Sequence, residues 1–412
     1  MKHIFTPQPI GTVKFITPGV IVVILVALNG LVFLAGRFIF GIGAVTNLDN
    51  FYPWGLWIGV DVAAGVALAA GGFTTAAIGH IFHRDSYHDV VRPALLTAML
   101  GYTFVAIGVM TDIGRWYYIW HPLIYWNANS ALFEVGICVV IYLNVLYIEF
   151  LPIVTERFIG KVNLPGFLGG LNGLVERILR WLDKSLNTTM FIFIIMGVVL
   201  STLHQSSIGT LTVIAGPKMH PLWQTPISPL LFFLSAIAVG FPMVIFESLI
   251  AARSFKLKPE TKVLGKLGRL LPPILGVYLT FKLVDMFIRE SFVYLAEFNV
   301  QSVMFVIELV VGVIIPLRLF LSRDILKSPL GLFIASAMVV GGVLINRINT
   351  FVVAYNPPYT DASYFPSFGE ISVTVGFIAL LVLAYRAFVF IFPVISQPNK
   401  SKSQDNKYSV RG

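Results

Sequence analysis

The sequence has very little cysteine and few charged residues. Cys138 is the only cysteine among 412 residues, and charged residues make up 12% of the chain. One cysteine can form neither an intrachain disulfide nor an iron–sulfur cluster or thiolate metal site. A soluble globular domain has about 25% charged residues, whereas here 57% of the residues are hydrophobic. The composition therefore excludes a soluble globule and indicates a polytopic membrane protein.

Histidine is also scarce, and this bears on haem. The seven histidines are at positions 3, 80, 83, 88, 121, 204 and 220. Only His80 and His204 lie clearly within apolar stretches, and the topology derived below places them at different depths in the membrane. Two ligands at different depths cannot hold one haem. We therefore predict no bound haem, no iron–sulfur cluster and no metal in this chain.

Long apolar runs dominate the rest of the sequence. A helix needs about 20 apolar residues to cross a hydrocarbon core of about 30 Å, and continuous rather than alternating runs favour helices over a barrel. The sequence predicts an all-α, polytopic membrane protein with about ten transmembrane helices in one domain, 1–396, followed by a disordered cytoplasmic tail, 397–412. The ten stretches are 17–39, 55–82, 92–118, 127–152, 187–212, 226–252, 269–291, 299–321, 329–351 and 369–392.

The distribution of Lys and Arg predicts the orientation. If both termini are cytoplasmic, 23 of the 29 basic residues fall on the cytoplasmic side, as the positive-inside rule requires. The net charge of +9 then reflects topology, and we expect no nucleic-acid partner. The segment 17–39 is expected to be the first span rather than a cleaved signal peptide.

A weak internal repeat links the two halves of the chain. The stretch 127–134 resembles 299–308, with Asn, Ser and Phe at equivalent positions, and an acid and an arginine about one turn apart precede each copy. The repeat predicts two four-helix bundles, 55–212 and 226–351, with the spans 17–39 and 369–392 outside them. Chance similarity among apolar helices is the alternative.

Two connecting regions carry further patterns. In the segment 171–184, Leu171, Leu174 and Ile178 alternate with basic residues in the manner of an amphipathic interfacial helix.

The predicted outer loops are rich in aromatic residues and proline, which favours a surface covered by a partner protein. Aromatic belts at the membrane interface explain part of that composition. These loops are 40–54, 116–126, 213–225 and 352–368.

Several ionisable or polar side chains fall inside the predicted spans at similar depth. Such groups are costly in hydrocarbon and are candidates for a substrate or proton path, and we expect these to surround one pocket near the outer surface. They are Asp61, Tyr102, Asp112, Arg115, Glu134, His204 and Gln205. A quinone head group fits such a pocket because it needs hydrogen-bond donors and protons.

The candidate roles follow from side-chain chemistry. We predict Glu134 and His204 as the catalytic proton carriers and an Asp112–Arg115 ion pair as the group that fixes the pocket. Gln205, Tyr102 and Asp61 are candidates for quinone binding. The alternative is that buried acid–arginine pairs only hold helices together and that a buried histidine bonds a neighbouring carbonyl group.

Other buried charges have weaker functional interpretations. With Glu134, the residues Glu149, Glu247 and His80 outline a proton path from the cytoplasm, although snorkelling explains Glu149 and Glu247 equally well. In the second half, acids and bases are nearly balanced, and we interpret them as mostly structural. These residues are Lys282, Asp285, Arg289, Glu308 and Arg347.

Seven motifs in order carry a resemblance to a known family. They are 51–61 (FYPWGLWIGVD), 91–96 (VRPALL), 111–115 (TDIGR), 127–134 (NANSALFE), 203–209 (LHQSSIG), 220–224 (HPLWQ) and 355–366 (YNPPYTDASYFP). Together they resemble the NrfD/PsrC family of integral membrane quinone-reactive subunits and, within it, the hydrogenase-2 branch (HybB type). The resemblance extends from about residue 7 to residue 393.

The resemblance implies a ten-helix subunit without its own redox cofactor. Such a subunit of the bacterial cytoplasmic (inner) membrane passes electrons between a periplasmic ferredoxin-like iron–sulfur subunit and menaquinone; in the hydrogenase branch the large and small Ni/Fe hydrogenase subunits feed that partner. Glu134 and His204 match family functional positions. Related subunits serve cytochrome- or sulfur-linked oxidoreductases, which stay as alternatives. A proton or ion transporter is the alternative from another class.

Overall fold

Long apolar helices form most of the chain that the structure describes. The computed structural model describes residues 5–11, 13–71, 74 and 88–398. Within these ranges nine helices are long and apolar enough to cross a membrane, and a shorter apolar helix, Trp57–Leu68, occupies the start of the predicted second span. The prediction of an all-α, polytopic membrane protein is confirmed.

The first half of the chain contains the elements that surround the candidate pocket. They are β1 (Phe5–Pro7), α1 (Pro18–Phe40), η1 (Ile42–Ala44), η2 (Trp57–Ala64), α2 (Gly65–Leu68), α4 (His88–Asp112), η5 (Trp116–Tyr118), α5 (His121–Ile124), α6 (Ala131–Phe158), η6 (Gly166–Leu171) and α7 (Asn172–Ala215).

The second half continues with shorter helical pieces between its long helices. They are η7 (Gly216–Lys218), α8 (Ser228–Ser254), α9 (Thr261–Gly268), α10 (Leu271–Ile288), η8 (Ser291–Glu297), α11 (Val300–Leu309), η9 (Val310–Ile314), α12 (Ile315–Phe320), η10 (Ile325–Lys327), α13 (Pro329–Ile348), η11 (Asn349–Val353), α14 (Phe368–Ile391) and β2 (Ser396–Pro398).

Side-chain caps determine where several membrane helices begin. The Ser130 hydroxyl accepts a hydrogen bond from the Phe133 amide (3.3 Å) at the start of α6, and Asn299 caps α11 in the same way. A cap oxygen satisfies an amide that has no partner within its own helix. The Ser130 cap places Glu134 in the first turn of α6.

In the part of the chain that the structure describes, three short π-helical segments interrupt the long helices, and each contains or adjoins a polar residue. Asp61 lies within η2, η9 follows Glu308 by two residues, and η11 begins at Asn349. A π-turn widens the helix by one residue and is frequent at functional sites. Each π-turn therefore changes the direction in which the neighbouring side chains point, close to one of these polar residues.

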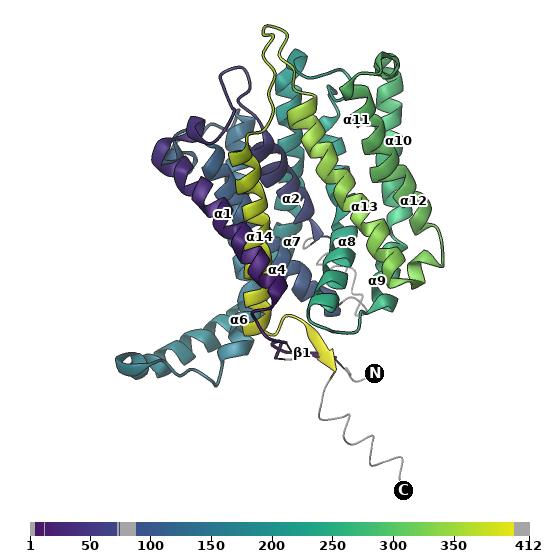
Figure 1. The fold of residues 1–412 in the computed structure, drawn as a ribbon. Helices are drawn as coiled ribbons and strands as arrows, with labels where there is room; N and C mark the ends of the chain where they lie inside the picture. The colour runs from purple at the N-terminus through teal and green to yellow at the C-terminus, as the bar shows by residue number, and fades with distance from the viewer. Residues whose placement is uncertain (1–4, 12, 72–73, 75–87, 399–412) are drawn as a thin grey trace.

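The helices pack around two large apolar clusters, one centred on α4, α6 and η2 and the other on α8, α10 and α13. Helix α1 packs along α14, and Gly30 faces Gly376 so closely that a Cβ on Gly30 would lie 2.6 Å from the Gly376 Cα. The loops between α4 and α6, between α7 and α8 and before α14 meet at one end of the bundle, here called the aromatic end. The strands β1 and β2 lie at the other end, here called the termini end (Figure 1).

Two predicted boundaries were wrong, and one helix continues further than predicted. Residues 397 and 398 belong to β2, which pairs antiparallel with β1, because main-chain hydrogen bonds to the N-terminal segment order the start of the predicted tail; residues 399–412 lie outside the described residues. The predicted third span, 92–118, ends early, because α4 stops at Asp112. The predicted interfacial segment 171–184 and the fifth span form one continuous helix, α7.

Candidate functional site

A cavity of about 650 Å³ lies at the aromatic end between η2, α4, α5, α6 and α7. Its size falls within the usual range of small-molecule sites, about 300–1,000 Å³. The wall is mostly apolar, with Val62, Val139 and Ile208 from three different elements. Among the described residues that line it, Asp112 is the only carboxylate and His121 the only imidazole. This arrangement suits an apolar ligand with a few hydrogen-bonding atoms.

Arg37, rather than Arg115, lies beside Asp112. The Arg37 guanidinium, from α1, donates hydrogen bonds to the carbonyl oxygens of Thr111 (2.7 Å) and Ile113 (2.6 Å), on either side of Asp112. Arg37 is buried, whereas Arg115 is exposed and forms none of the ion pairs found within the described ranges. The predicted Asp112–Arg115 ion pair is wrong because α4 ends at Asp112, so the two residues are not one turn apart on one helix.

Asp61 lies behind the cavity wall, against α14. Its Oδ2 accepts a hydrogen bond from the Thr374 hydroxyl (2.8 Å). Asp61 itself does not line the cavity, although Val62 and Ala63 do. The carboxyl group is therefore close to the site but turned toward another helix.

Glu134 joins α6 to α7. Its Oε1 accepts a hydrogen bond from the Ser207 hydroxyl at 2.6 Å. Ser207 is buried, while Glu134 is exposed on the surface of the helical bundle. The neighbours Phe133 and Val135 line the cavity, but Glu134 does not. The carboxylate thus stands at the edge of the pocket, on the α6–α7 seam.

His204 and Gln205 are completely buried in α7. Within the described part of the chain, neither ring nitrogen of His204 and neither amide atom of Gln205 has a hydrogen-bond partner. Buried polar atoms without partners are rare and indicate water, a ligand or a functional role. Neither residue lines the cavity; Ile208, one turn from His204, does.

A buried polar column leads from His204 toward the termini end. The Tyr102 ring lies 5.7 Å from the His204 ring and 4.4 Å from the Tyr142 ring. Tyr142 interacts electrostatically with Glu149, and Glu149 lies against α7, where a Cβ on Gly197 would be 2.8 Å from the Glu149 Oε1. The structure thus brings Tyr102, His204 and Glu149 to one interface.

The sequence reasoning missed two members of this column, Tyr142 and Ser201. Both are buried, and Ser201 lies near both tyrosines, although its hydroxyl has no hydrogen-bond partner among the described residues. The spacing of Glu134, Tyr142 and Glu149 places them on one face of α6, and this periodicity was the available signal. Tyrosine and serine are too common in apolar helices for the signal to stand out without the structure.

Glu247 lies at a different interface. It is on α8, near Thr97 of α4 and Tyr385 of α14, but among the described residues neither of its carboxylate oxygens has a hydrogen-bond partner. Tyr385 lines a smaller cavity of about 70 Å³ at the termini end, together with Lys258. The structure does not bring Glu247 and Glu149 to one place, and the predicted path residue His80 lies outside the described residues.

The second half contains a dense polar network, centred on Glu308. Lys282 forms a buried ion pair with Glu308, which also accepts hydrogen bonds from Trp223 (3.1 Å), Asn346 (2.8 Å) and Asn349 (2.9 Å). Both oxygens of this carboxylate therefore have donors. A buried ion pair needs such additional hydrogen bonds to offset its desolvation.

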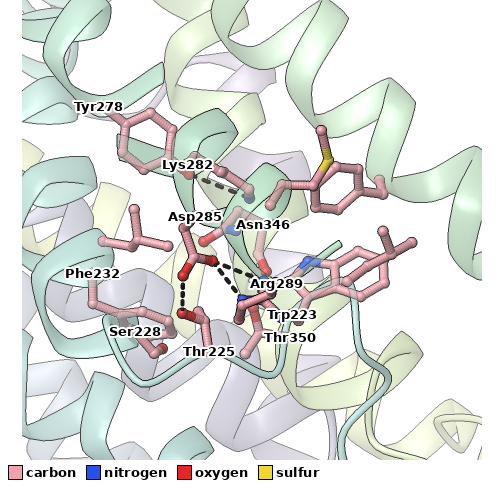
Figure 2. A pocket seen from close by; sticks show the side chains of 14 residues that line it. Trp223, Thr225, Ser228, Phe232, Tyr278, Lys282, Asp285, Arg289, Asn346 and Thr350 are labelled. Atoms are coloured by element: carbon pink, nitrogen blue, oxygen red, sulfur yellow. Dashed lines mark hydrogen bonds and ion pairs between the residues drawn. The ribbon is translucent and has the colours of Figure 1, made fainter. Parts of the chain in front are cut away.

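Asp285 is equally well paired (Figure 2). Its two oxygens accept from Thr225 (2.8 Å) and Arg289 (2.9 Å), and Arg289 also donates to the Gln224 carbonyl (2.5 Å). The adjoining void measures about 20 Å³, enough for about one water molecule. This region has the features of a structural anchor and offers no room for a substrate.

Arg347 is the fully buried cation of this half. It donates to Asn346 (2.5 Å) and to the Ser235 hydroxyl (2.8 Å), and its guanidinium carbon lies 3.8 Å from the centre of the Phe232 ring. The amide, the hydroxyl and the ring face replace part of its hydration. Arg347 therefore ties α13 to α8.

The loops at the aromatic end are tied together by Glu370 of α14. Its Oε2 accepts from the amides of Asn47 (3.1 Å) and Ser367 (2.9 Å), and its Oε1 accepts from the Tyr364 hydroxyl. Burial, and this hydrogen bond to Glu370, raise the pKa of Tyr364. The Tyr355 ring packs on Tyr52 and Trp54. Part of the predicted docking loop is therefore internal, while Phe365 remains exposed.

The described histidines do not offer a pair of axial haem ligands. His121 packs among Tyr118, Trp120 and Tyr125, while His220 contacts Trp223 and Tyr294. The nearest aromatic ring to His204 is that of Tyr102. No group of three metal-ligating side chains is present within the described ranges either. A bis-histidine haem does not fit these residues.

Comparison with known proteins places the chain in a family. Residues 44–356 match the family described as "Polysulphide reductase, NrfD". The chain is 32% identical to the "Probable Ni/Fe-hydrogenase 2 b-type cytochrome subunit" of Escherichia coli (strain K12), over 100% of this chain and 99% of that protein. The chain belongs to the NrfD family of membrane subunits of respiratory oxidoreductases.

Two further relatives come from Nitratidesulfovibrio vulgaris. One, named only as a protein, is 36% identical over 93% of this chain and 95% of its own length. The other, "Menaquinone reductase, integral membrane subunit", is 26% identical over 87% of this chain and 88% of its own length. Both relatives extend over most of this chain.

Proposed function

We propose that this chain binds menaquinone in the 650 Å³ cavity beside Asp112 and passes it electrons from an extrinsic iron–sulfur subunit. The observation that carries the proposal is the cavity itself: it is apolar on most of its wall and has one carboxylate and one imidazole. A quinone ring with its isoprenoid tail has the complementary character. The printed name of the N. vulgaris menaquinone reductase subunit supports menaquinone as the substrate.

The reaction at this site is reduction of the quinone to the quinol. It consumes two electrons, which the partner supplies, and two protons, one for each carbonyl oxygen. Asp112 is the wall group that can meet a carbonyl oxygen directly. Glu134 stands at the edge of the pocket and His204 is buried one turn from the wall residue Ile208, so we assign them to proton delivery rather than to direct contact. Gln205 and Tyr102 adjoin His204, while Asp61 stands behind Val62.

The polar column supports a proton supply from the termini end. It leads from Glu149 past Tyr142 and Tyr102 to His204. Glu247 and the 70 Å³ cavity beside Tyr385 form a second entry at the same end, and His80 is the further candidate. Protons drawn from the cytoplasm would make quinone reduction electrogenic if the electrons start in the periplasm.

Location and partners follow from the same proposal. The aromatic end faces the periplasm, both termini are cytoplasmic, and the chain lies in the bacterial inner membrane. The exposed aromatic residues of 116–126 suit the docking of a ferredoxin-like iron–sulfur subunit. The large and small subunits of a Ni/Fe hydrogenase would bind that subunit and supply its electrons. The name of the E. coli relative supports a hydrogenase complex. That name also calls the relative a b-type cytochrome subunit, but we propose that this chain binds no haem.

A quinone-reactive subunit of a different oxidoreductase is the second candidate. The chain is also 23% identical to a selenate reductase subunit of Mesobacillus selenatarsenatis, over 86% of this chain, and the name of that relative favours a different electron partner. The transporter hypothesis from the sequence has less support, because the buried acids Glu308 and Asp285 of the second half are paired with Lys282 and Arg289.

The test is menaquinol formation by the purified complex. The iron–sulfur partner is reduced, and quinol is measured for the parent complex and for Asp112→Asn, Glu134→Gln and His204→Ala. We expect each variant to be slower by roughly 10²-fold, as for loss of a proton-transfer group. Asp324→Asn, an exposed acid at the termini end, is the control. Unchanged quinol formation in all three variants would contradict the proposal.

A further inference from the structure

Helix α7 is longer than its membrane-spanning part. The span candidate within it begins at Thr188, whereas the helix begins at Asn172. Residues 172–187, here called the α7 arm, therefore lie beyond the span. In Figure 1 this region projects sideways from the bundle at the termini end. None of the proposed quinone chemistry uses it.

The arm is held in place by hydrogen bonds to the end of α6 and the loop that follows. Both carboxylate oxygens of Glu176 accept from the Gly160 amide (3.0 Å each). The Asn172 Oδ1 accepts from the Leu164 amide (2.9 Å), and Asp183 accepts from the Thr155 hydroxyl (3.2 Å). The orientation of the arm is therefore fixed by the fold.

One face of the arm is apolar and exposed. Leu171, Leu174, Ile178 and Trp181 follow one another at spacings of three and four residues, so they form a single stripe, and all four are exposed, Trp181 to 65%. Phe167, in the preceding loop, is 93% exposed. No described element of the chain covers this stripe.

A basic face adjoins the apolar stripe. Arg177, Arg180 and Lys184 are on the arm and follow one another at spacings of three and four residues. The two acids of the arm, Glu176 and Asp183, are turned toward the α6 connection by the hydrogen bonds given above. Glu176 also forms an ion pair with Arg180 (2.6 Å), whose side chain is still 63% exposed. The surface that the arm presents outward is therefore apolar on one side and positively charged on the other.

We propose that the α7 arm binds anionic phospholipids at the membrane surface of the termini end. The stripe enters the acyl-chain boundary, and the three basic side chains contact lipid phosphates. Charge favours lipid over a protein partner: the basic residues lie beside the C-terminal part of the apolar stripe, and the arm continues directly into a membrane-spanning helix. Tryptophan also prefers the membrane interface.

The depth of the arm can be measured with spin labels. Because Cys138 is the only cysteine, a Cys138→Ala background allows single labels at Leu174, Ile178, Arg177 or Lys184. The full chain is reconstituted in nanodiscs of phosphatidylglycerol or of phosphatidylcholine. In phosphatidylglycerol we expect the labels at 174 and 178 to collide with oxygen and the labels at 177 and 184 with a water-soluble nickel chelate.

A charge variant separates lipid binding from simple proximity. The triple variant Arg177→Gln, Arg180→Gln, Lys184→Gln should weaken phosphatidylglycerol binding about fivefold for each residue removed, so protection at Ile178 should require more phosphatidylglycerol. Lys256→Gln, Lys262→Gln, Lys266→Gln removes the same charge from exposed positions elsewhere at the termini end and should leave the protection unchanged.

Three results would overturn the proposal. One is free access of the nickel chelate to the label at Ile178 in phosphatidylglycerol nanodiscs. Another is protection that appears only when the extrinsic subunits are added, which would assign the stripe to a protein partner. The third is equal protection of the label at Ile178 from the nickel chelate in phosphatidylglycerol and in phosphatidylcholine nanodiscs. That result would show that the basic side chains do not contribute to lipid binding.

Discussion

The Ser207 hydroxyl donates a 2.6 Å hydrogen bond to the Glu134 carboxylate and so connects α7 to α6 at the edge of the cavity. Ser207 is the only residue within the described ranges that donates to this carboxylate. The bond fixes the position of Glu134 relative to Phe133 and Val135, which line the cavity. Helix α7 therefore determines where the Glu134 carboxylate lies.

Removal of this hydroxyl should slow quinone reduction. A hydrogen bond to a charged group contributes about 1.5–3 kcal/mol, so Ser207→Ala should lower the rate by roughly 10- to 100-fold if Glu134 delivers protons. Menaquinol formation by the purified complex is the measurement. The adjacent Ser206→Ala is the matched control and should keep the parent rate. Equal rates for Ser207→Ala and Ser206→Ala would show that Glu134 does not deliver protons to the quinone.

The assignment of Arg37 predicts different effects for two arginines. Arg37→Gln removes donors from the buried carbonyl groups of Thr111 and Ile113 and should destabilise the protein by about 1–3 kcal/mol. Arg115→Gln changes an exposed side chain and should stay within about 0.5 kcal/mol of the parent. Thermal unfolding in one detergent gives both values. A larger loss of stability for Arg115→Gln than for Arg37→Gln would instead support the Asp112–Arg115 ion pair expected from the sequence.

The cavity can be filled from α6. Gly136 lines it, and a Cβ added there meets only the Pro122 Cγ at 3.9 Å. Gly136→Leu should therefore place its side chain in the cavity without moving the backbone, and we expect the KM for menaquinone to rise at least about tenfold. Gly276→Leu is the control, because no atom lies within 4 Å of an added Cβ there. An unchanged KM for Gly136→Leu would place the quinone elsewhere.

The Glu308 network should behave as a structural unit. Lys282→Met leaves Glu308 buried without its ion-pair partner, which should cost about 3–5 kcal/mol. The double variant with Glu308→Gln should recover part of that loss, since no buried carboxylate remains. Unfolding of the single and double variants measures the coupling, with the exposed Lys266→Met as control. Additive losses would show that the two side chains do not stabilise each other.

Much of the fold was predictable because hydrophobic runs are local. The apolar stretches predicted the membrane helices, and in the structure Ser130 and Asn299 cap two of them close to the predicted starts at residues 127 and 299. The end of α4 at Asp112 was not predictable, since the sequence continues with apolar and aromatic residues. Nor was the order in residues 397 and 398, which depends on pairing with β1.

The sequence predicted which types of residue the candidate site contains better than it predicted which of them meet. The sequence marked His204 as a costly buried group, and the structure shows it fully buried. Yet the cavity wall contains Asp112 and His121 rather than Glu134 and His204. His121 was missed because it falls in an aromatic loop, where a single histidine carries no distinctive pattern.

The sequence by itself determined that this is a polytopic all-α membrane protein whose first half carries several costly polar groups, because burial of apolar runs depends on composition and length. Only the tertiary structure decided which groups meet. Arg37 reaches the end of α4 from α1, and Ser207 reaches Glu134 from α7. Such contacts join residues more than 70 positions apart, and π-helical turns such as η2 change the direction of side chains locally. Helix periodicity alone contains neither kind of information.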